Sequence, residues 1–121
     1  MNNFEQGMHK NDANFVPLTP ISFLDRIKDV YPGYEALVYK ERKYSWRQVY
    51  DRCTRFASAL TKVGIGKGDV VSIMAANTPE MFEAHYSVPM TGGVVNTINT
   101  RLDTRTVAYI LDHSDCKVFI V

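Results

Sequence analysis

The clearest pattern in the chain is a long amphipathic helix that starts behind residue 45. Ser45 and Gln48 match the Ser-x-x-Gln capping box, which predicts a helix beginning there. Apolar residues then recur every three or four positions over about five turns, which indicates one buried stripe. The residues of this stripe are Trp46, Val49, Tyr50, Cys53, Phe56, Ala57, Leu60 and Val63. The opposite face is interpreted as solvated rather than as a binding surface. It carries Arg47, Asp51, Arg52, Arg55 and Lys62.

Two shorter elements are expected before this helix. Thr19 can cap a helix that has Pro20 at its first position, where proline already has a helical φ. The run "EALVYK" is typical of a short strand. Glu41-Arg42 is expected to turn the chain back into "KYS", so that these residues form a hairpin.

The second half of the chain alternates strand and helix patterns. Three apolar runs, "DVVSIMAA", "GGVVNTIN" and "CKVFIV", are typical of parallel strands covered on both faces. Thr78 and Asp103 can cap the helices between them. This β-α-β-α-β order predicts a parallel, doubly wound sheet with right-handed crossovers. The fold class is therefore α/β, with a helix, a short hairpin and the long amphipathic helix in front of the sheet.

Composition and charge narrow the class of protein. The 121 residues are 45% hydrophobic and 22% charged, which is an ordinary globular balance. The formal net charge of +1 disfavours nucleic acid or an anionic membrane as a partner bound by bulk charge. No apolar run reaches the roughly 18 residues of a transmembrane helix. The amino-terminal pattern does not resemble a leader peptide, so we expect a cytoplasmic protein.

The chain is expected to divide near residue 18. Residues 1–18 are predicted to be a mobile polar extension, and residues 19–121 an incomplete amino-terminal α/β domain. The last apolar run, "KVFIV", would leave an open sheet edge that is prone to pair with other chains. We therefore expect the isolated chain to be marginally stable or to aggregate, and a monomer with an ordinary cooperative melt would contradict this.

The stretch "VGIGKGDVV" resembles a phosphate-binding loop but lacks its essential features. Lys67 is followed by Gly68 rather than by Ser or Thr, and the glycines are spaced G-x-G-x-G rather than G-x-G-x-x-G. Phosphate loops follow a strand and open a helix, whereas this loop follows a helix and enters a strand. Gly64 lies where a left-handed glycine ends a helix, so the loop is predicted to be a cap and a turn.

Other potential chemistry is weak in the sequence. Cys53 and Cys116 stand alone and are expected to be reduced, mostly buried thiols. Ser114, His113 and Asp112 are sequence neighbours, and such neighbours do not face one another as a catalytic triad requires. The histidines outside the extension, at positions 85 and 113, are expected to be capping or half-buried residues, and His9 to be uninvolved.

The order of these elements resembles the start of the adenylate-forming acyl-CoA synthetases, a family that includes luciferases and peptide-synthetase adenylation domains. The run "YSWRQVY" is similar to the first core motif of the family, and "SVPMTGGVVNTIN" is similar to the second. The phrase "EAHYSVPMTGGVVNTINTRLD" resembles the short- and medium-chain branch of acyl-activating enzymes. The resemblance covers residues 17–121, which is nearly the whole chain.

The resemblance implies an acid–CoA ligase that acts in two steps. ATP and a carboxylic acid, with Mg²⁺, give an acyl-adenylate and pyrophosphate, and coenzyme A then displaces AMP to give a thioester. The family's phosphate loop, adenine pocket, metal-coordinating Glu, ribose-binding Asp and catalytic Lys match no position here. We therefore name no catalytic, cofactor-binding or metal residue, neither His85 nor Lys67. The chain alone is expected to be inactive, and to bind ATP, Mg²⁺ and CoA poorly, because acid and CoA would bind to a segment that it does not contain.

Two other classes of function stay open at this stage. A small flavodoxin-like binding module would bind its ligand after the strand ends, where open parallel sheets bind ligands. The residues to test would be Asn77, Thr78, Asn99, Thr100 and Arg101, although structural capping is expected for all five. An interaction protein would instead bind a partner through its open sheet edge.

Overall fold

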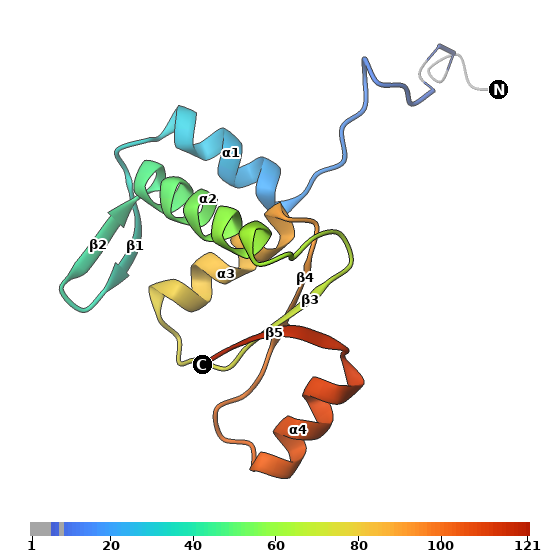
Figure 1. Ribbon diagram of the computed structural model, residues 1–121. Coiled ribbons are helices and arrows are strands. Elements are labelled where there is room, and N and C mark those ends of the chain that lie inside the picture. Colours follow the sequence, from blue (N-terminus) through green and yellow to red (C-terminus); the bar gives the residue numbers. More distant parts are fainter. Residues whose placement is uncertain (1–5, 8) are drawn as a thin grey trace.

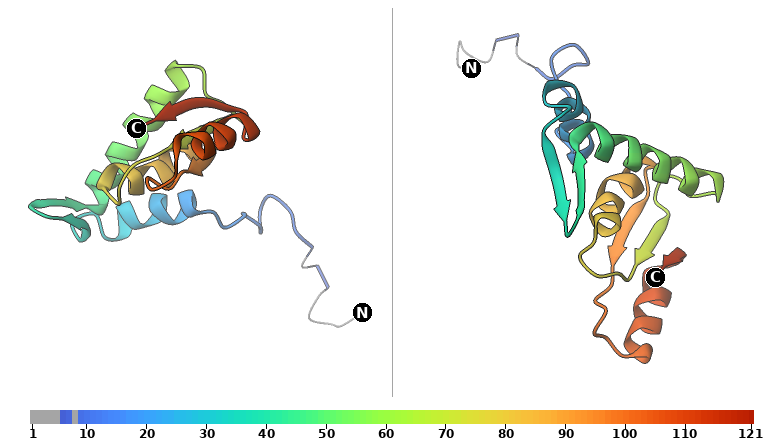
Figure 2. Two further views of the ribbon diagram at one scale, coloured as in Figure 1. Left: turned by 90° about the horizontal axis from the view of Figure 1, so that it is seen from below. Right: turned by 90° about the vertical axis from the view of Figure 1, so that its left-hand side faces the viewer.

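The computed structural model describes residues 6, 7 and 9–121. The expected extension of residues 1–18 therefore lies partly outside the described residues. Its described part leads away from the body of the molecule (Figures 1 and 2) and includes a turn in which the Phe15 N–H donates to the Asn11 carbonyl oxygen at 3.0 Å. Its expected mobility stays a prediction.

The first helix and the hairpin form where the sequence predicts them. Helix α1 spans Pro20–Val30, and Thr19 and Ser22 cap its amino end reciprocally. Strands β1 (Glu35–Tyr39) and β2 (Arg42–Ser45) pair antiparallel. The turn lies at residues 40–41, one residue earlier than expected. The reason is that Tyr39 pairs with Arg42, which leaves Lys40 in the left-handed region with φ 53°.

Helix α2 (Trp46–Lys62) carries the predicted capping box, and both of its reciprocal hydrogen bonds form. Val49, Cys53 and Leu60 are buried, as the stripe predicts. The prediction was wrong for Val63, whose residue is 67% exposed. The helix ends at Lys62, so the position after it no longer follows the helical period.

A Schellman motif ends helix α2 and explains the glycine that follows it. Gly64 has φ 91°, and its N–H donates to the Thr61 carbonyl oxygen at 3.0 Å. The Ile65 N–H donates to the Leu60 carbonyl oxygen at 3.0 Å, and both of these side chains are buried in one cluster. This is the hydrogen-bond pattern and apolar contact of a Schellman cap, so Gly64 is required for its backbone conformation. Ile65 takes the buried place that the stripe assigned to Val63.

Replacing Gly64 with alanine is expected to lower the free energy of unfolding by about 1–2 kcal/mol, because an L-residue is strained in the left-handed region. A Cβ atom at Gly64 would meet no atom within 4 Å, so the loss would be conformational. Gly33→Ala is the matched control, since a Cβ there also meets nothing and the φ of Gly33 is not positive. Urea unfolding of both variants measures the difference, and equal midpoints would contradict the assignment.

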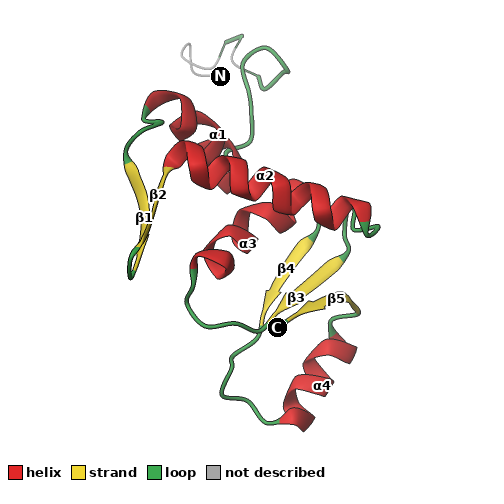
Figure 3. Ribbon diagram, turned by 60° about the vertical axis from the view of Figure 1, so that its left-hand side comes forward, coloured by secondary structure: helices red, strands yellow, loops and turns green. Residues whose placement is uncertain are grey.

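The second half of the chain is the predicted parallel β-α-β-α-β unit. Its elements are β3 (Val70–Ile73), α3 (Pro79–Met90), β4 (Val94–Thr97), α4 (Thr104–His113) and β5 (Cys116–Ile120). The strand order is β4-β3-β5, with both pairings parallel. Helices α2 and α3 lie on one side of the sheet and α4 on the other (Figure 3). The sheet is therefore doubly wound, because the two crossovers run in opposite directions from the central strand.

The core lies between the sheet and helices α2 and α3. Val71 of β3 packs with Leu60, Ile65 and Val88, and Ile73 packs with Met81 and Ala84 of α3. A second cluster joins α1, the hairpin and α2 around Leu24, Val49 and Cys53. In contrast, helix α4 contributes no fully buried residue. The face of the sheet under α4 is thus less completely covered than the face under α3.

Candidate functional site

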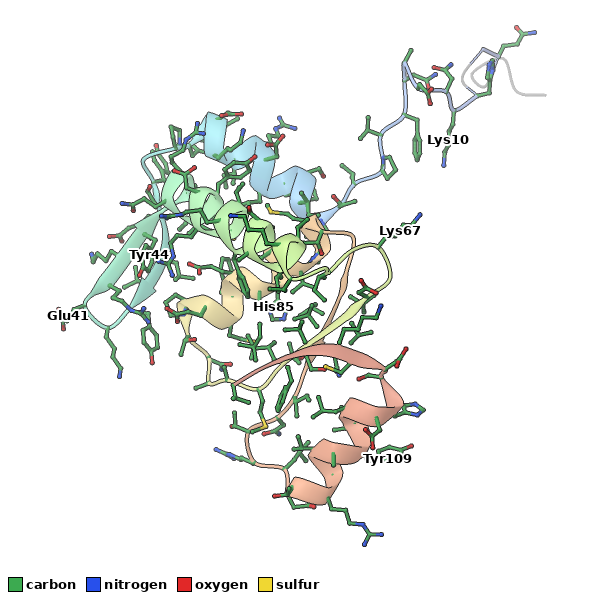
Figure 4. The ribbon with its side chains drawn as sticks, viewed as in Figure 1. Lys10, Glu41, Tyr44, Lys67, His85 and Tyr109 are labelled. Carbon is green, nitrogen blue, oxygen red and sulfur yellow. The ribbon has the colours of Figure 1, made fainter. Side chains whose placement is uncertain are left out.

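The glycine loop lies at the amino ends of the strands and is built as a structural turn. The Gly66 N–H donates to the Asp69 carboxylate at 2.9 Å, and Asp69 also pairs with Lys117 at 2.6 Å. The Lys117 ammonium and the Gly66 N–H together lower the pKa of the Asp69 carboxyl. Lys67 points outward, away from the sheet (Figure 4). The loop therefore places a carboxylate, not free N–H groups, where a phosphate would have to bind, which matches the prediction that it is no nucleotide site.

A polar pocket lies at the opposite, carboxyl ends of β3 and β4. It has a volume of about 600 Å³. Asn77, Asn99 and Thr100 contribute its polar side chains, and Met81, His85 and Ile98 are among its other lining residues. This is the end of an open parallel sheet at which ligands bind.

The five residues proposed for a binding module have different places in the structure. Thr78 caps helix α3, where its hydroxyl accepts from the Met81 N–H at 3.4 Å. The Asn99 side-chain oxygen accepts from the Arg101 N–H at 2.9 Å, which shapes the loop after β4. Capping or turn formation thus explains Thr78 and Asn99, while Asn77 and Thr100 face the pocket and Arg101 does not line it.

A second, apolar pocket adjoins the first. It lies between the hairpin and the amino half of α3 and has a volume of about 580 Å³. Leu37, Val38 and Phe82 form much of its wall. Asn77, Met81 and His85 line both pockets, so the two meet along one edge.

His85 lies on helix α3 at the junction of these two pockets (Figure 4). Its Nδ1 is 2.8 Å from the Met81 carbonyl oxygen, and because a carbonyl only accepts, Nδ1 carries the proton. The Nε2 atom is left for another partner. The other described histidine of the domain, His113, stacks on Tyr109 with ring centroids 5.5 Å apart. Ser114 donates to the Leu111 carbonyl oxygen and accepts from Asn96, so it forms no triad with His113.

An ion-pair cluster joins the hairpin to helices α2 and α3. Glu83 is 4% exposed and forms a bidentate pair with Arg52, whose guanidinium also lies 4.7 Å from the centre of the Tyr44 ring. Arg42 pairs with Glu80 at 2.7 Å, and this pair lowers the pKa of Glu80 to about 2. The expectation of a wholly solvated α2 face was wrong for Arg52, because a buried carboxylate on α3 faces it.

The two cysteines are free, as expected. Burial raises the pKa of the Cys53 thiol to about 11, so it is not a thiolate nucleophile at neutral pH. Cys116 is half-buried, and its thiol donates to the Val118 carbonyl oxygen at 3.1 Å. Neither thiol faces the strand-end pocket.

Metal and membrane sites were also considered over the part of the chain that the structure describes. Within it, no three side chains from His, Cys, Asp and Glu come together as metal ligands. The same described residues include no helix with the length and apolar character needed to cross a bilayer.

The sequence matches the family model of the AMP-binding enzymes over residues 24–121. The chain belongs to the AMP-binding enzyme family. The predicted resemblance to adenylate-forming acyl-CoA synthetases is thereby confirmed.

Several curated relatives of this AMP-binding chain are CoA ligases. It is 51% identical, over 91% of its length, to the peroxisomal butyrate–CoA ligase AAE11 of Arabidopsis thaliana. It is 47% identical, over 91% of its length, to the peroxisomal benzoate–CoA ligase of the same plant. In each case it covers 19% of the relative, so the chain spans about a fifth of the length of these proteins.

Solved structures confirm the fold of this AMP-binding chain. The amino-terminal domain of FACL13 from Mycobacterium tuberculosis superposes with a TM-score of 0.78 at 32% identity. That match covers 81% of this chain and 25% of the FACL13 chain. The amino-terminal subdomain of NpsA from Klebsiella oxytoca gives the same TM-score at 24% identity and covers 84% of this chain and 26% of its own. The mixed α/β fold with its parallel sheet is thus that of adenylate-forming enzymes.

The expected cytoplasmic location was wrong. The names of five of the relatives found, from Arabidopsis thaliana and Petunia hybrida, include the word peroxisomal. A peroxisomal address is a short tripeptide read by a receptor, and it changes neither composition nor the amino-terminal pattern. The features used to infer the cytoplasm therefore do not distinguish the two compartments.

Sequence reasoning treated His85 and Glu83 of this AMP-binding chain as ordinary helix residues. The structure places His85 beside two pockets and buries Glu83 against Arg52. Both follow from how α3 packs between α2, the hairpin and the sheet, which the sequence periodicity of α3 does not define. An unusual signal was present at Glu83, since it falls between Met81 and Ala84, which are buried.

Proposed function

We propose that this chain contributes to an AMP-forming acid–CoA ligase, which converts ATP, a carboxylic acid and coenzyme A to acyl-CoA, AMP and pyrophosphate. The observation that carries the proposal is the 51% identity to a butyrate–CoA ligase within the AMP-binding family. Since the chain spans about a fifth of that relative, the whole reaction is a property of the longer protein.

We further propose that the acid is a fatty or other acid of short or medium chain length. The names of the relatives support a small apolar acid, because they include butyrate, benzoate and trans-cinnamate ligases. The two neighbouring pockets at the carboxyl end of the sheet are consistent with a molecule that has one polar end.

The role of this chain in such a ligase is to build one wall of the site. Adenylation gives the acid a good leaving group, and Mg²⁺ neutralises phosphate charge during that transfer. The described residues bring no set of metal ligands together, so we assign Mg²⁺ no ligand in this chain. ATP, too, is assigned no residue, because the glycine loop holds a carboxylate and faces the amino ends of the strands.

A chimera tests the proposed function. This chain would replace the matching fifth of the Arabidopsis butyrate–CoA ligase, and ATP–pyrophosphate exchange would be measured with butyrate and with benzoate. We expect exchange by the chimera and none by the 121-residue chain alone. Omitting the acid is the control for background exchange. A folded chimera that shows no acid-dependent exchange would contradict the proposal.

The flavodoxin-like binding module is not favoured, although the strand order β4-β3-β5 starts like that fold. The family match covers 98 consecutive residues, from 24 to 121, which include the hairpin and α2 in front of the sheet. A flavodoxin-like fold does not explain those elements.

A further inference from the structure

The apolar pocket between the hairpin and helix α3 has the form of a small-molecule site. Its volume of about 580 Å³ lies within the usual range for ligand pockets. Its wall is mainly hydrocarbon from Pro20, Leu37, Val38, Pro79 and Phe82. Such a wall favours the apolar body of a ligand, because burying that body removes it from water.

The polar side chains of this pocket lie where it meets the strand-end pocket. Asn77 and His85 line both cavities, and both residues are exposed to solvent. Since the Nδ1–H of His85 is held by the Met81 carbonyl oxygen, the ring is oriented and Nε2 is the atom left for a ligand. An apolar cavity with a few convergent polar groups at one end suits a molecule with the same division.

The charges around the two pockets do not oppose an acid. Their lining includes no Asp, Glu, Lys or Arg among the described residues. The nearby carboxylate of Glu80, at the start of α3, is compensated by Arg42, which also fixes the hairpin against the helix. The apolar wall formed by the hairpin is therefore held in place by a contact outside the pocket.

We propose that this pocket binds the hydrocarbon part of a monocarboxylic acid, with its carboxyl group at Asn77 and His85. A carboxyl group and the His85 Nε2 atom share one proton between them, and the Asn77 amide donates to the other carboxyl oxygen. The proposal rests on the proposed function for the class of ligand. It adds a place on this chain where the acid binds before or apart from any reaction.

Direct binding tests the proposal on the 121-residue chain without ATP or CoA. Octanoate is titrated by calorimetry, and the NMR shift of the Met81 methyl group reports on the shared edge of the pockets. We expect saturable binding with a shift of that methyl signal. Octan-1-ol has the same chain without the carboxyl group and is expected to bind about tenfold more weakly, the effect of one lost charge-assisted hydrogen bond.

Two substitutions probe the two ends of the ligand, and each has a matched control. His85→Gln removes the imidazole and is expected to raise the Kd for octanoate about tenfold. Val38→Ser removes part of the apolar wall and is expected to raise it severalfold. His113→Gln and Val63→Ser change exposed residues elsewhere and are expected to leave it unchanged. Val38 is 57% exposed, so its variant retains the fold, which circular dichroism verifies.

Three results would overturn the proposal. They are no saturable binding of octanoate, equal binding of octan-1-ol, or an equal effect of the pocket variants and their controls. None of these results bears on the ligase activity, which the exchange assay of the chimera measures separately. Conversely, a chimera without exchange leaves the binding result to stand, so the two proposals fail separately.

Discussion

Replacing Arg52 with alanine is expected to lower the free energy of unfolding by about 3 kcal/mol. The substitution would leave the Glu83 carboxylate without its bidentate partner, although Glu83 is only 4% exposed. An unpaired buried charge costs far more than an ion pair contributes at the surface. The cluster also joins α2 to α3 and contacts Tyr44 of the hairpin, so its loss affects three elements. Urea unfolding followed by circular dichroism measures the change.

Arg47→Ala is the matched control for Arg52→Ala. Arg47 is also an arginine of helix α2, and it pairs at 2.9 Å with Asp29, whose side chain is 61% exposed. Its loss is expected to lower the free energy of unfolding by less than about 1 kcal/mol. The double variant Arg52→Leu, Glu83→Leu removes both charges and is expected to recover most of the stability. Equal losses from Arg52→Ala and Arg47→Ala would show that burial of Glu83 is unimportant.

The local chemistry of the chain predicted the helix starts and the order of elements. Thr19, Ser45, Thr78 and Asp103 each accept a backbone N–H at the start of a helix, as predicted. A cap depends on three or four consecutive residues, and those residues are visible in the sequence. For the same reason the sequence predicted the left-handed glycine at position 64.

Features that depend on distant contacts were not predictable in this way. The burial of Glu83 depends on Arg52, which is 31 residues away. The pocket edge at His85 depends on Asn77 and on the loop after β4, which the sheet brings beside α3. The hairpin turn was misplaced by one residue because strand register depends on pairing, and a two-residue turn fits several registers.

The candidate site was predictable as a location rather than as a set of residues. A parallel β-α-β order implies that ligands bind at the carboxyl ends of the strands, and the 600 Å³ pocket lies there. Which side chains line that pocket is decided by the loop conformations. Thr78 and Asn99 are partly used by the backbone, whereas Asn77 faces the cavity. The prediction that this chain holds no catalytic residue stays a prediction.

Replacing Leu60 with alanine is expected to lower the free energy of unfolding by about 3 kcal/mol, because it leaves a cavity in the core. Leu60 is 4% exposed and packs with Ile65, Val71 and Val88, which join α2, the glycine turn, β3 and α3. Val63→Ala is the matched control, since Val63 follows Leu60 by three positions on the predicted stripe but is 67% exposed. The control is expected to change stability by less than about 0.5 kcal/mol. Thermal and urea unfolding compare the two variants, and a loss at Val63 equal to that at Leu60 would mean that α2 continues past Lys62 and buries the whole stripe.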